Sequence, residues 1–324
     1  MCLILEKYKP ILKKHMKLKF IFLFALIYIQ NPVFGQNNFS DNPLDAVFET
    51  KDSENFWIAF DKMDKSKENP FIEYMQKGSP GVKAFTENRI INADSLFKVV
   101  KKRKADYELT RNVLNDLASK EKRVRAIYSA LKYWYPKAKF PPIYFVYGRF
   151  NSGGTSAPEG VIVGTEMLQN LDGISGLIAH ELIHYQQNIT GKDMLLKWCL
   201  MEGGADFIGE LISGESINSF SYKYGAQHKD KLCEEFVSRL KNTDYLDWLY
   251  GTTKKDDRPN DLGYWMGYKI IESYFNKQKD KQKAIDEILN IKDPLLFLQQ
   301  SGFLDAYIEK YQKSKKESFD AFFK

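Results

Sequence analysis

The sequence predicts an α+β protein that is mostly helical, with a small mixed sheet packed against a central pair of helices. Apolar residues recur at largely helical spacing over much of the 324-residue chain. Two short segments, 143–147 and 160–164, instead have the β-branched and aromatic content of strands. The composition is 44% apolar and 28% charged, which is ordinary for a folded protein and argues against extensive disorder.

Helical patterns lie on both sides of the two strands. Residues 92–135 predict two or three amphipathic helices, which end at a group of three prolines. The segment 153–158 carries two glycines and a proline and predicts a turn. Two longer helices are expected next, one capped by Asp172 or Ser175 and closed by Gly191, the other from 194 to 213. The sequence beyond 220 is again mostly helical in pattern.

The first 35 residues predict an export signal. A lysine-rich start is followed by an apolar run at 20–29 and by the small-residue end 33–35. This run is about half of the roughly 20 apolar residues that cross a bilayer as a helix, so we expect cleavage near Gly35 and no stable membrane span afterwards. Translation of the protein starts at Met1 or at Met16. We expect export from a bacterial cytoplasm by the Sec route, into the periplasm or out of the cell.

The chain therefore divides into four expected parts. They are a signal peptide at 1–35, a mainly helical region at 36–140, a core at 141–220 and a helical region at 221–324. The signal holds +5 of the net charge of +6, which leaves about +1 for the rest and predicts no nucleic-acid partner. After processing, Cys199 and Cys233 remain, either paired in an oxidising compartment or as two buried thiols.

One of the two long predicted helices contains the pattern His180-Glu181-Leu182-Ile183-His184. Residues four apart lie about 40° from each other around a helix axis, so both imidazoles project from one face and can bind one metal ion. Glu181 lies one position further around the helix. Because the flanking residues are largely apolar, these polar groups would be costly to bury unless they were paired or bound to a metal.

A third ligand for zinc is available on the next predicted helix. Glu202 lies 18 residues beyond His184, and two helices joined by a turn would bring its carboxylate to the histidines. Asp206, four residues later, can accept the second N–H of a ligand histidine and fix its orientation. Two other residues could occupy the position of this third ligand. Glu210 is one, although it is also typical of a solvated carboxylate, and Cys199 is the other, although it is also typical of a packed thiol.

His-Glu-x-x-His followed by Glu-x-x-x-Asp resembles the signature of the gluzincin metallopeptidases. Residues 180–187 and 202–206 look most like the predicted Zn-dependent proteases of bacterial genomes, and the resemblance covers about 143–213. It implies a zincin-like core, with the sheet packed on the metal-binding helices. It also implies that the strand at 160–165 is the sheet edge along which an extended peptide substrate pairs.

The resemblance also assigns roles to the site residues. It implies one zinc ion held by His180, His184 and Glu202, with Glu181 as general base and Asp206 as the partner of a ligand histidine. The function expected from this set is that of an exported zinc metallopeptidase acting on a peptide or protein.

The sequence leaves open which residue donates a hydrogen bond to the oxyanion, and it also leaves open two alternative functions. A donor to the oxyanion is usual in such sites, and Tyr264 or His228 could supply it, although a core aromatic residue and a surface histidine are the simpler interpretations. The alternative functions are a non-catalytic binding or assembly protein of the cell envelope and a zinc hydrolase of non-peptide amides or esters. An intact Glu181 argues against the non-catalytic protein.

Overall fold

The computed structural model describes residues 39–251, 253 and 257–323. The expected signal peptide at 1–35 lies outside the described residues. Within them, no helix combines the length and the apolar character that a membrane crossing requires.

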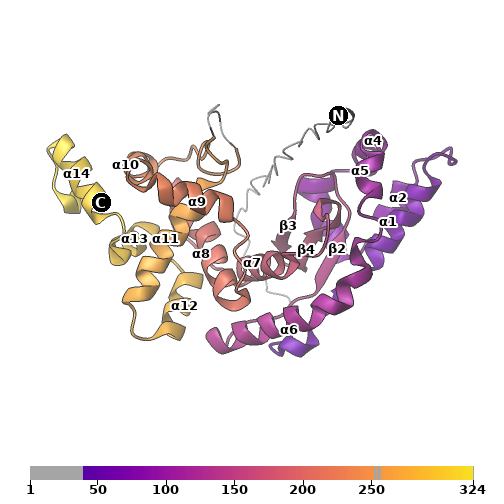
Figure 1. Ribbon diagram of the computed structural model, residues 1–324, viewed down its shortest axis with the longest axis horizontal. Helices are drawn as coiled ribbons and strands as arrows, with labels where there is room; N and C mark the ends of the chain where they lie inside the picture. Colours follow the sequence, from indigo (N-terminus) through magenta and orange to yellow (C-terminus); the bar gives the residue numbers. More distant parts are fainter. Residues whose placement is uncertain (1–38, 252, 254–256, 324) are drawn as a thin grey trace, which may run out of the picture.

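The predicted α+β class is confirmed: helices predominate around one small mixed sheet (Figure 1). The strand order is β1-β2-β4-β3, with β1, β2 and β4 parallel and β3 antiparallel to β4. The strands are β1 (Phe48–Glu49), β2 (Ile143–Val146), β3 (Gly154–Ala157) and β4 (Gly160–Gly164).

The helices fall into a first group that precedes β2 in sequence and a second group that follows β4, and in Figure 1 α1, α2, α4 and α5 lie on one side of the sheet and α8 to α14 on the other. The first group consists of η1 (Pro43–Asp45), α1 (Lys51–Lys62), α2 (Phe71–Gln76), α3 (Pro80–Phe85), the π-helix η2 (Thr86–Ile90), α4 (Ala93–Lys102), α5 (Lys104–Glu108), η3 (Val113–Asp116) and α6 (Leu117–Trp134). The second group consists of η4 (Thr165–Met167), α7 (Ile174–Gln186), α8 (Leu195–Ser213), α9 (Ser219–Gln227), α10 (Lys229–Arg239), α11 (Leu262–Lys277), α12 (Lys281–Leu289), α13 (Pro294–Ser301), α14 (Asp305–Lys315) and η5 (Phe319–Phe323). The three amphipathic helices expected between 92 and 135 are α4, α5 and α6.

The two central strands are buried on both faces because successive side chains alternate between two cores. Ile143, Phe145 and Val163 pack into the core formed with α6, α7 and α8. Tyr144 and Ile162 point the other way, into an aromatic-rich core formed with α1 to α5. The sheet is therefore shared: α1 to α5 cover one of its faces, and α6 covers the other together with α7 and α8.

The expected edge strand is wrong. Residues 160–164 form the interior strand β4, and the edge is β3, which lies where the sequence predicts only a turn. Gly154-Thr155-Ser156-Ala157 has little intrinsic strand preference, and it becomes a strand by pairing with β4 across the short turn at 158–159. This pairing is tertiary information that local composition does not contain.

The expected cap of α7 is also wrong. The helix follows Gly173 in the left-handed conformation (φ 76°), and no side chain caps it, so neither Asp172 nor Ser175 is the cap. The helix ends at Gln186, and Gly191 follows in the segment after it. The backbone N–H of Asp172 is instead bound by the side chain of Asn170, which shapes the preceding turn.

A buried carboxylate holds the loop that joins β2 to β3. Glu166 is 1% exposed and accepts hydrogen bonds from the backbone N–H groups of Gly148 (2.8 Å) and Phe150 (3.1 Å). Burial raises its pKa from the ordinary 4.5 to about 7, against the lowering effect of these N–H donors. The loop that leads to β3 thus depends on an acid that ionises near neutral pH.

This carboxylate predicts a measurable pH dependence of stability. Between pH 4.5 and about 7 the unfolded chain ionises at Glu166 while the folded chain does not, so its contribution to stability falls as the pH rises. Relative to Glu166→Gln, the wild type should lose up to about 3 kcal/mol of unfolding free energy between pH 4.5 and pH 8, measured by urea denaturation. The exposed Glu68→Gln should follow the wild type throughout, and a pH-independent difference for Glu166→Gln would contradict the assignment.

Helices α8 and α11 pack against each other at two glycines. A Cβ on Gly203 would lie 2.1 Å from the backbone nitrogen of Tyr268, and a Cβ on Gly267 would lie 1.7 Å from the carbonyl oxygen of Cys199. Backbone atoms cannot move aside as a side chain can, so α8 reaches this position only because both residues are glycine.

A matched pair of substitutions tests this packing. Gly203→Ala should lower the free energy of unfolding by about 3 kcal/mol or more, since the new methyl group meets the α11 backbone. Gly204→Ala, one residue along, meets only side chains, the nearest being the amide of Gln187 at 3.3 Å, and should change stability by no more than about 1 kcal/mol. Equal losses in chemical denaturation would show that the close approach of the two helices is not the cause.

Candidate metal centre

The centre lies between α7 and α8, both of which are mostly buried. Helix α7 contacts β3, β4, α6 and α8, so it is enclosed on nearly all sides, which matches its apolar sequence. His180 pairs with Asp206 and His184 with Glu202. Because these pairs run in opposite directions along the two sequences, the helices are antiparallel, as the sequence predicts.

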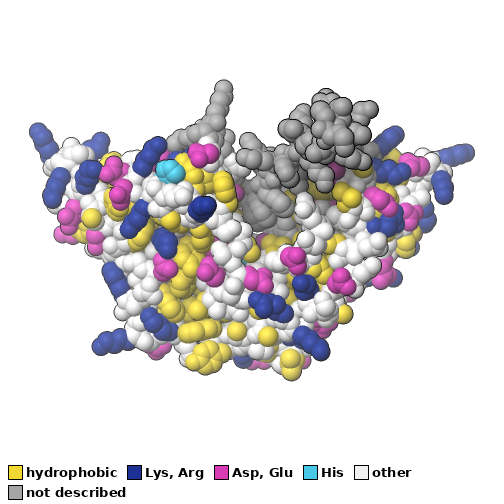
Figure 2. Space-filling model, viewed as in Figure 1, with side chains coloured by type: hydrophobic (Ala, Val, Ile, Leu, Met, Phe, Trp, Pro, Cys, Tyr) yellow, Lys and Arg dark blue, Asp and Glu magenta, His cyan; other side chains and the backbone are white. Residues whose placement is uncertain are grey.

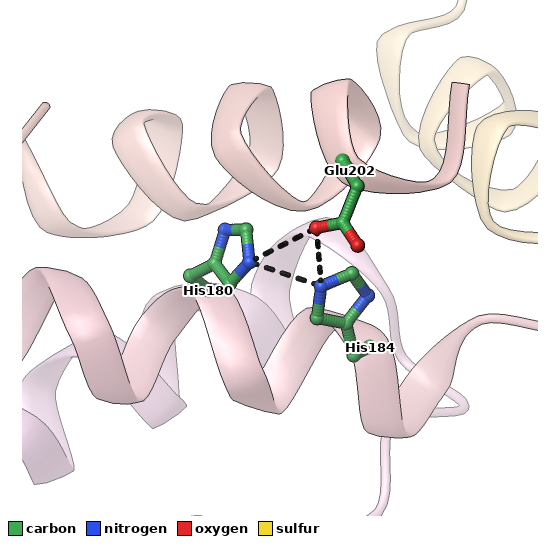
Figure 3. Close-up of side chains that lie close together, drawn as sticks. All are labelled: His180, His184 and Glu202. Carbon is green, nitrogen blue, oxygen red and sulfur yellow. Dashed lines mark hydrogen bonds and ion pairs between the residues drawn. The ribbon is translucent and has the colours of Figure 1, made fainter. Parts of the chain in front are cut away.

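Three side chains converge at this point (Figure 3). The Nε2 atoms of His180 and His184 lie 2.9 Å apart. Oε2 of Glu202 lies 3.6 Å from the first nitrogen and 3.1 Å from the second. These ligand atoms all lie within 4.8 Å of one another, so a single ion could contact all three.

The other nitrogen of each imidazole is occupied. Nδ1 of His180 contacts a carboxylate oxygen of Asp206 at 2.7 Å, and Nδ1 of His184 contacts the amide oxygen of Gln187 at 2.8 Å. The amide nitrogen of Gln187 donates to the carbonyl of Met201, which fixes the orientation of the amide. Both partners are acceptors, so each Nδ1 carries the proton and each Nε2 presents a lone pair to the centre.

Asp206 is itself held in place from α9. Its second oxygen accepts hydrogen bonds from Nδ2 of Asn218 (2.7 Å) and from the hydroxyl of Tyr222 (2.6 Å). Asn218 stands at the N-terminal end of α9, and Tyr222 lies one turn into it. The start of α9 therefore fixes the carboxylate that orients His180.

This arrangement fits a metal ion and suits zinc. Two imidazole nitrogens and a carboxylate oxygen, all acceptors, face one another with no donor among them, which is unfavourable unless a cation lies between them.

The pKa shifts of these residues also favour a bound cation. Burial would raise the pKa of Glu202, but His184 and His180 outweigh it and hold the pKa well below 4.5. Burial would lower the pKa of His180, but Asp206 and Glu202 outweigh it and raise the pKa, so the cluster favours an added positive charge.

Glu181 lies beside this group and is 1% exposed. Its Oε1 atom has no hydrogen-bond partner among the described residues. A Cβ on Gly154 would lie 2.7 Å from that oxygen, so the absence of a side chain at the start of β3 leaves room for the carboxylate. Burial raises the pKa of Glu181, with the two histidines acting against it. A carboxylate with a raised pKa is a stronger proton acceptor.

The remaining candidates are placed differently. Tyr264 stacks on His180, with ring centroids 6.0 Å apart and planes 15° apart, and its buried hydroxyl has no hydrogen-bond partner among the described residues. His228 lies between α9 and α10, where its Nδ1 contacts the carbonyl of Tyr224 at 2.9 Å. Glu210 lies outside the group of three. Cys199 and Cys233 are both buried and free, so the second of the two expectations for the cysteines is confirmed.

Sequence reasoning missed three polar residues of this network. The sequence could have indicated the contact of Gln187 with His184, because Gln187 follows it by three positions at the end of the same helix. Asn218 and Tyr222 had no comparable signal. They meet Asp206 because α9 packs on α11, the helix that also packs on α8.

Comparison with known proteins agrees with this chemistry. Residues 148–293 match the model of a family described as Predicted Zn-dependent protease (DUF2268). The matched segment runs from β3 through α12, and it contains the complete His-His-Glu group. No curated protein and no solved structure matches the chain. The match and the site together support a zinc-dependent protease.

The geometry predicts how zinc binding depends on the ligand and orienting residues. The purified protein should bind one zinc ion per chain, and His184→Ala should lose it because only two ligands remain. Asp206→Asn should weaken zinc binding about 10- to 100-fold, since the ring of His180 loses its carboxylate partner. Elemental analysis and chelator competition measure both effects. Glu210→Gln, one turn further along α8, is the matched control, and zinc loss in that variant would move the third ligand to Glu210.

Proposed function

We propose that this protein is an exported zinc metallopeptidase of the gluzincin type, with His180, His184 and Glu202 as the zinc ligands and Glu181 as general base. The observation that carries the proposal is the convergence of three acceptor atoms, from the buried His180 and Glu202 and the partly buried His184, beside the buried carboxylate of Glu181. A buried site without a metal would have no use for three acceptors facing one another.

The chemistry follows from the placement of Glu181. Zinc held by three protein ligands supplies an activated water molecule and polarises the carbonyl of the bond to be cleaved. Glu181 accepts the proton of the attacking water and then delivers it to the leaving amine. Its buried position and raised pKa suit both steps, because the carboxylate must accept a proton readily and later release it.

A peptide substrate has a place beside this carboxylate. Among the described residues β3 pairs with β4 along one edge only, so its other edge can pair with an extended peptide. Gly154 begins β3 and lies against Glu181, which would bring a peptide bound along this strand to the general base. The substrate strand is thus β3 in place of the segment 160–165.

Tyr264 is the donor we propose for the carbonyl oxygen as it gains negative charge. Its hydroxyl is buried and its ring stacks on a ligand histidine. We prefer it to His228, which lies between α9 and α10 with its Nδ1 against the carbonyl of Tyr224.

The proposed partner is a peptide or protein, with no nucleic acid. On the face seen in Figure 2, Lys and Arg side chains are interspersed with Asp and Glu, so this face shows no basic stripe that would follow a phosphate backbone. Export by the Sec route, with removal of residues 1–35 and release to the periplasm or beyond, is part of the proposal and rests on the pattern of that segment.

Glu181→Gln is the decisive variant for this function. It should lower peptide hydrolysis by about 10²- to 10⁴-fold, since the amide cannot accept the proton, while zinc content stays at the wild-type level. The assay is digestion of a complex peptide library, with the new termini read by mass spectrometry. Glu210→Gln should retain activity.

Two results would contradict the proposal. A zinc-loaded Glu181→Gln with unchanged hydrolysis would remove the general base. A zinc-loaded wild type that cleaves no peptide would favour the envelope-binding protein or the hydrolase of non-peptide amides.

A further inference from the structure

The first turn of α9 binds the metal centre and leaves the helix without a side-chain cap. Asn218 occupies the N-cap position, where an asparagine side chain ordinarily accepts a hydrogen bond from the first turn of its own helix. No side chain caps α9, and Nδ2 of Asn218 instead donates to Oδ2 of Asp206 at 2.7 Å. A residue well suited to stabilise the helix is therefore used to hold the carboxylate behind a zinc ligand.

The rest of α9 has few attachments. Only Ser221 and Gly225 of its nine residues are buried, and a helix this short is marginal in water without tertiary contacts. A Cβ on Gly225 would lie 2.3 Å from the ring of Trp265 on α11. The ring of Tyr222 meets that of Tyr268, also on α11, with centroids 5.0 Å apart. An element with so little buried surface opens more readily than the core of a protein.

The turn before α9 is held separately from the helix. Gly214 ends α8 in the left-handed conformation, with φ 71°. Glu215 then accepts hydrogen bonds from the backbone N–H of Gly176 on α7 (2.9 Å) and from Nε of Arg123 on α6 (3.0 Å). Since these contacts do not involve α9, the helix can separate from Asp206 without disturbing α8 or the turn.

Asp206 is the point at which α9 meets the zinc ligands. Its Oδ2 atom accepts hydrogen bonds from Asn218 and from the hydroxyl of Tyr222 (2.6 Å), and its Oδ1 atom lies 2.7 Å from Nδ1 of His180. Among the described residues, these are the hydrogen bonds that the carboxylate makes. When α9 separates, only His180 still holds the carboxylate, and the ring of His180 is oriented less firmly.

We propose that zinc binding and the docking of α9 are coupled through Asp206, with Tyr222 as the positioning residue. His180 with a bound ion keeps its ring fixed, and the fixed ring holds Asp206 where α9 binds it. The coupling is reciprocal by linkage, so the factor by which zinc favours docked α9 is the factor by which docked α9 favours zinc. The inference rests on the zinc ligands of the proposed function and needs no substrate.

The coupling makes α9 the element that controls retention of the metal. Separation of α7 from α8 would expose the apolar core that both helices share, whereas separation of α9 exposes two buried residues. Opening at α9 is thus the less costly route by which the support of His180 is lost. Zinc makes this opening rarer without changing the docked position of the helix.

Hydrogen exchange of the backbone amides tests the coupling. In the zinc-loaded wild type, residues 219–227 should exchange about tenfold more slowly than after a chelator has removed the metal. Helix α14, which packs mainly on α10 and η5, is the internal control and should exchange equally in both states. His184→Ala keeps only two ligands, so added zinc should not slow the exchange of α9 in that variant.

Tyr222→Phe tests the positioning role, because it removes the hydroxyl and keeps the ring. Zinc should dissociate into a chelator about 3- to 10-fold faster, and the cobalt-substituted variant should have an altered visible spectrum, since a ligand is oriented less firmly. Tyr274→Phe is the matched control: the Tyr274 hydroxyl also donates to a carboxylate at 2.6 Å, that of Glu287, between α11 and α12. It should match the wild type in both measurements.

Asn218→Ala removes the other donor to Asp206 and should also speed zinc dissociation. It replaces Tyr222→Phe in the test if that variant fails to fold, and the exchange experiment on the wild type decides the coupling without any variant.

Three results would overturn the inference. Equal exchange of α9 with and without zinc removes the coupling and leaves the peptidase function standing. Exchange that rises equally in α9 and α14 after chelation shows that zinc stabilises the whole fold with no particular link to α9. Dissociation and cobalt spectra of the wild-type kind in Tyr222→Phe remove the positioning role.

The outcome for the proposed function is separate. A zinc-loaded wild type that cleaves no peptide, but whose α9 exchanges more slowly with zinc, supports the coupling and contradicts the peptidase. A wild type that binds no zinc contradicts both.

Discussion

The packing of α7 against α8 is the constraint on which the rest of the structure depends. Two largely apolar helices bury four ionisable residues between them, and those groups are satisfied only in one register, with His180 opposite Asp206 and His184 opposite Glu202. A shift of one residue along either helix would leave buried charges facing apolar side chains, which costs several kcal/mol per group. The sheet holds α7 from one side, and α11 holds α8 through the contact at Gly203 and Gly267.

The hydrogen bonds behind the histidines give the site its chemistry. Asp206 and Gln187 take the Nδ1 protons, and their own orientations are set by α9 and by the carbonyl of Met201. Each imidazole therefore keeps one tautomer, with its Nε2 lone pair aimed at Glu202. Because the ligands are already arranged within the protein, metal binding requires little reordering of side chains.

The sequence predicted the parts of the site that depend on local spacing. Residues four apart on a helix share a face. The spacing therefore places His180 with His184 on α7 and Glu202 with Asp206 on α8, and the antiparallel pairing of these two helices brings the four residues together. It did not predict β3, because Gly154-Thr155-Ser156-Ala157 becomes a strand only through its partner β4. Tyr222 was missed for a related reason: it reaches Asp206 from a separate helix, α9, and no periodicity records such a contact. The fold class was predictable because helical and strand periods persist over whole segments, whereas helix caps and sheet edges depend on single contacts.

The part of the chain that matches the family model depends on the part before it, because the two share one sheet. The matched segment begins at residue 148, after β1, β2 and the helices of the first group. It contains all three metal-binding candidates and Glu181, yet β4 stays buried only if β2 lies beside it and the first group covers the Tyr144 and Ile162 face. The first group is thus needed to keep β3 and Gly154 against Glu181. Residues outside the family match therefore hold in place the strand on which the position of Glu181 depends.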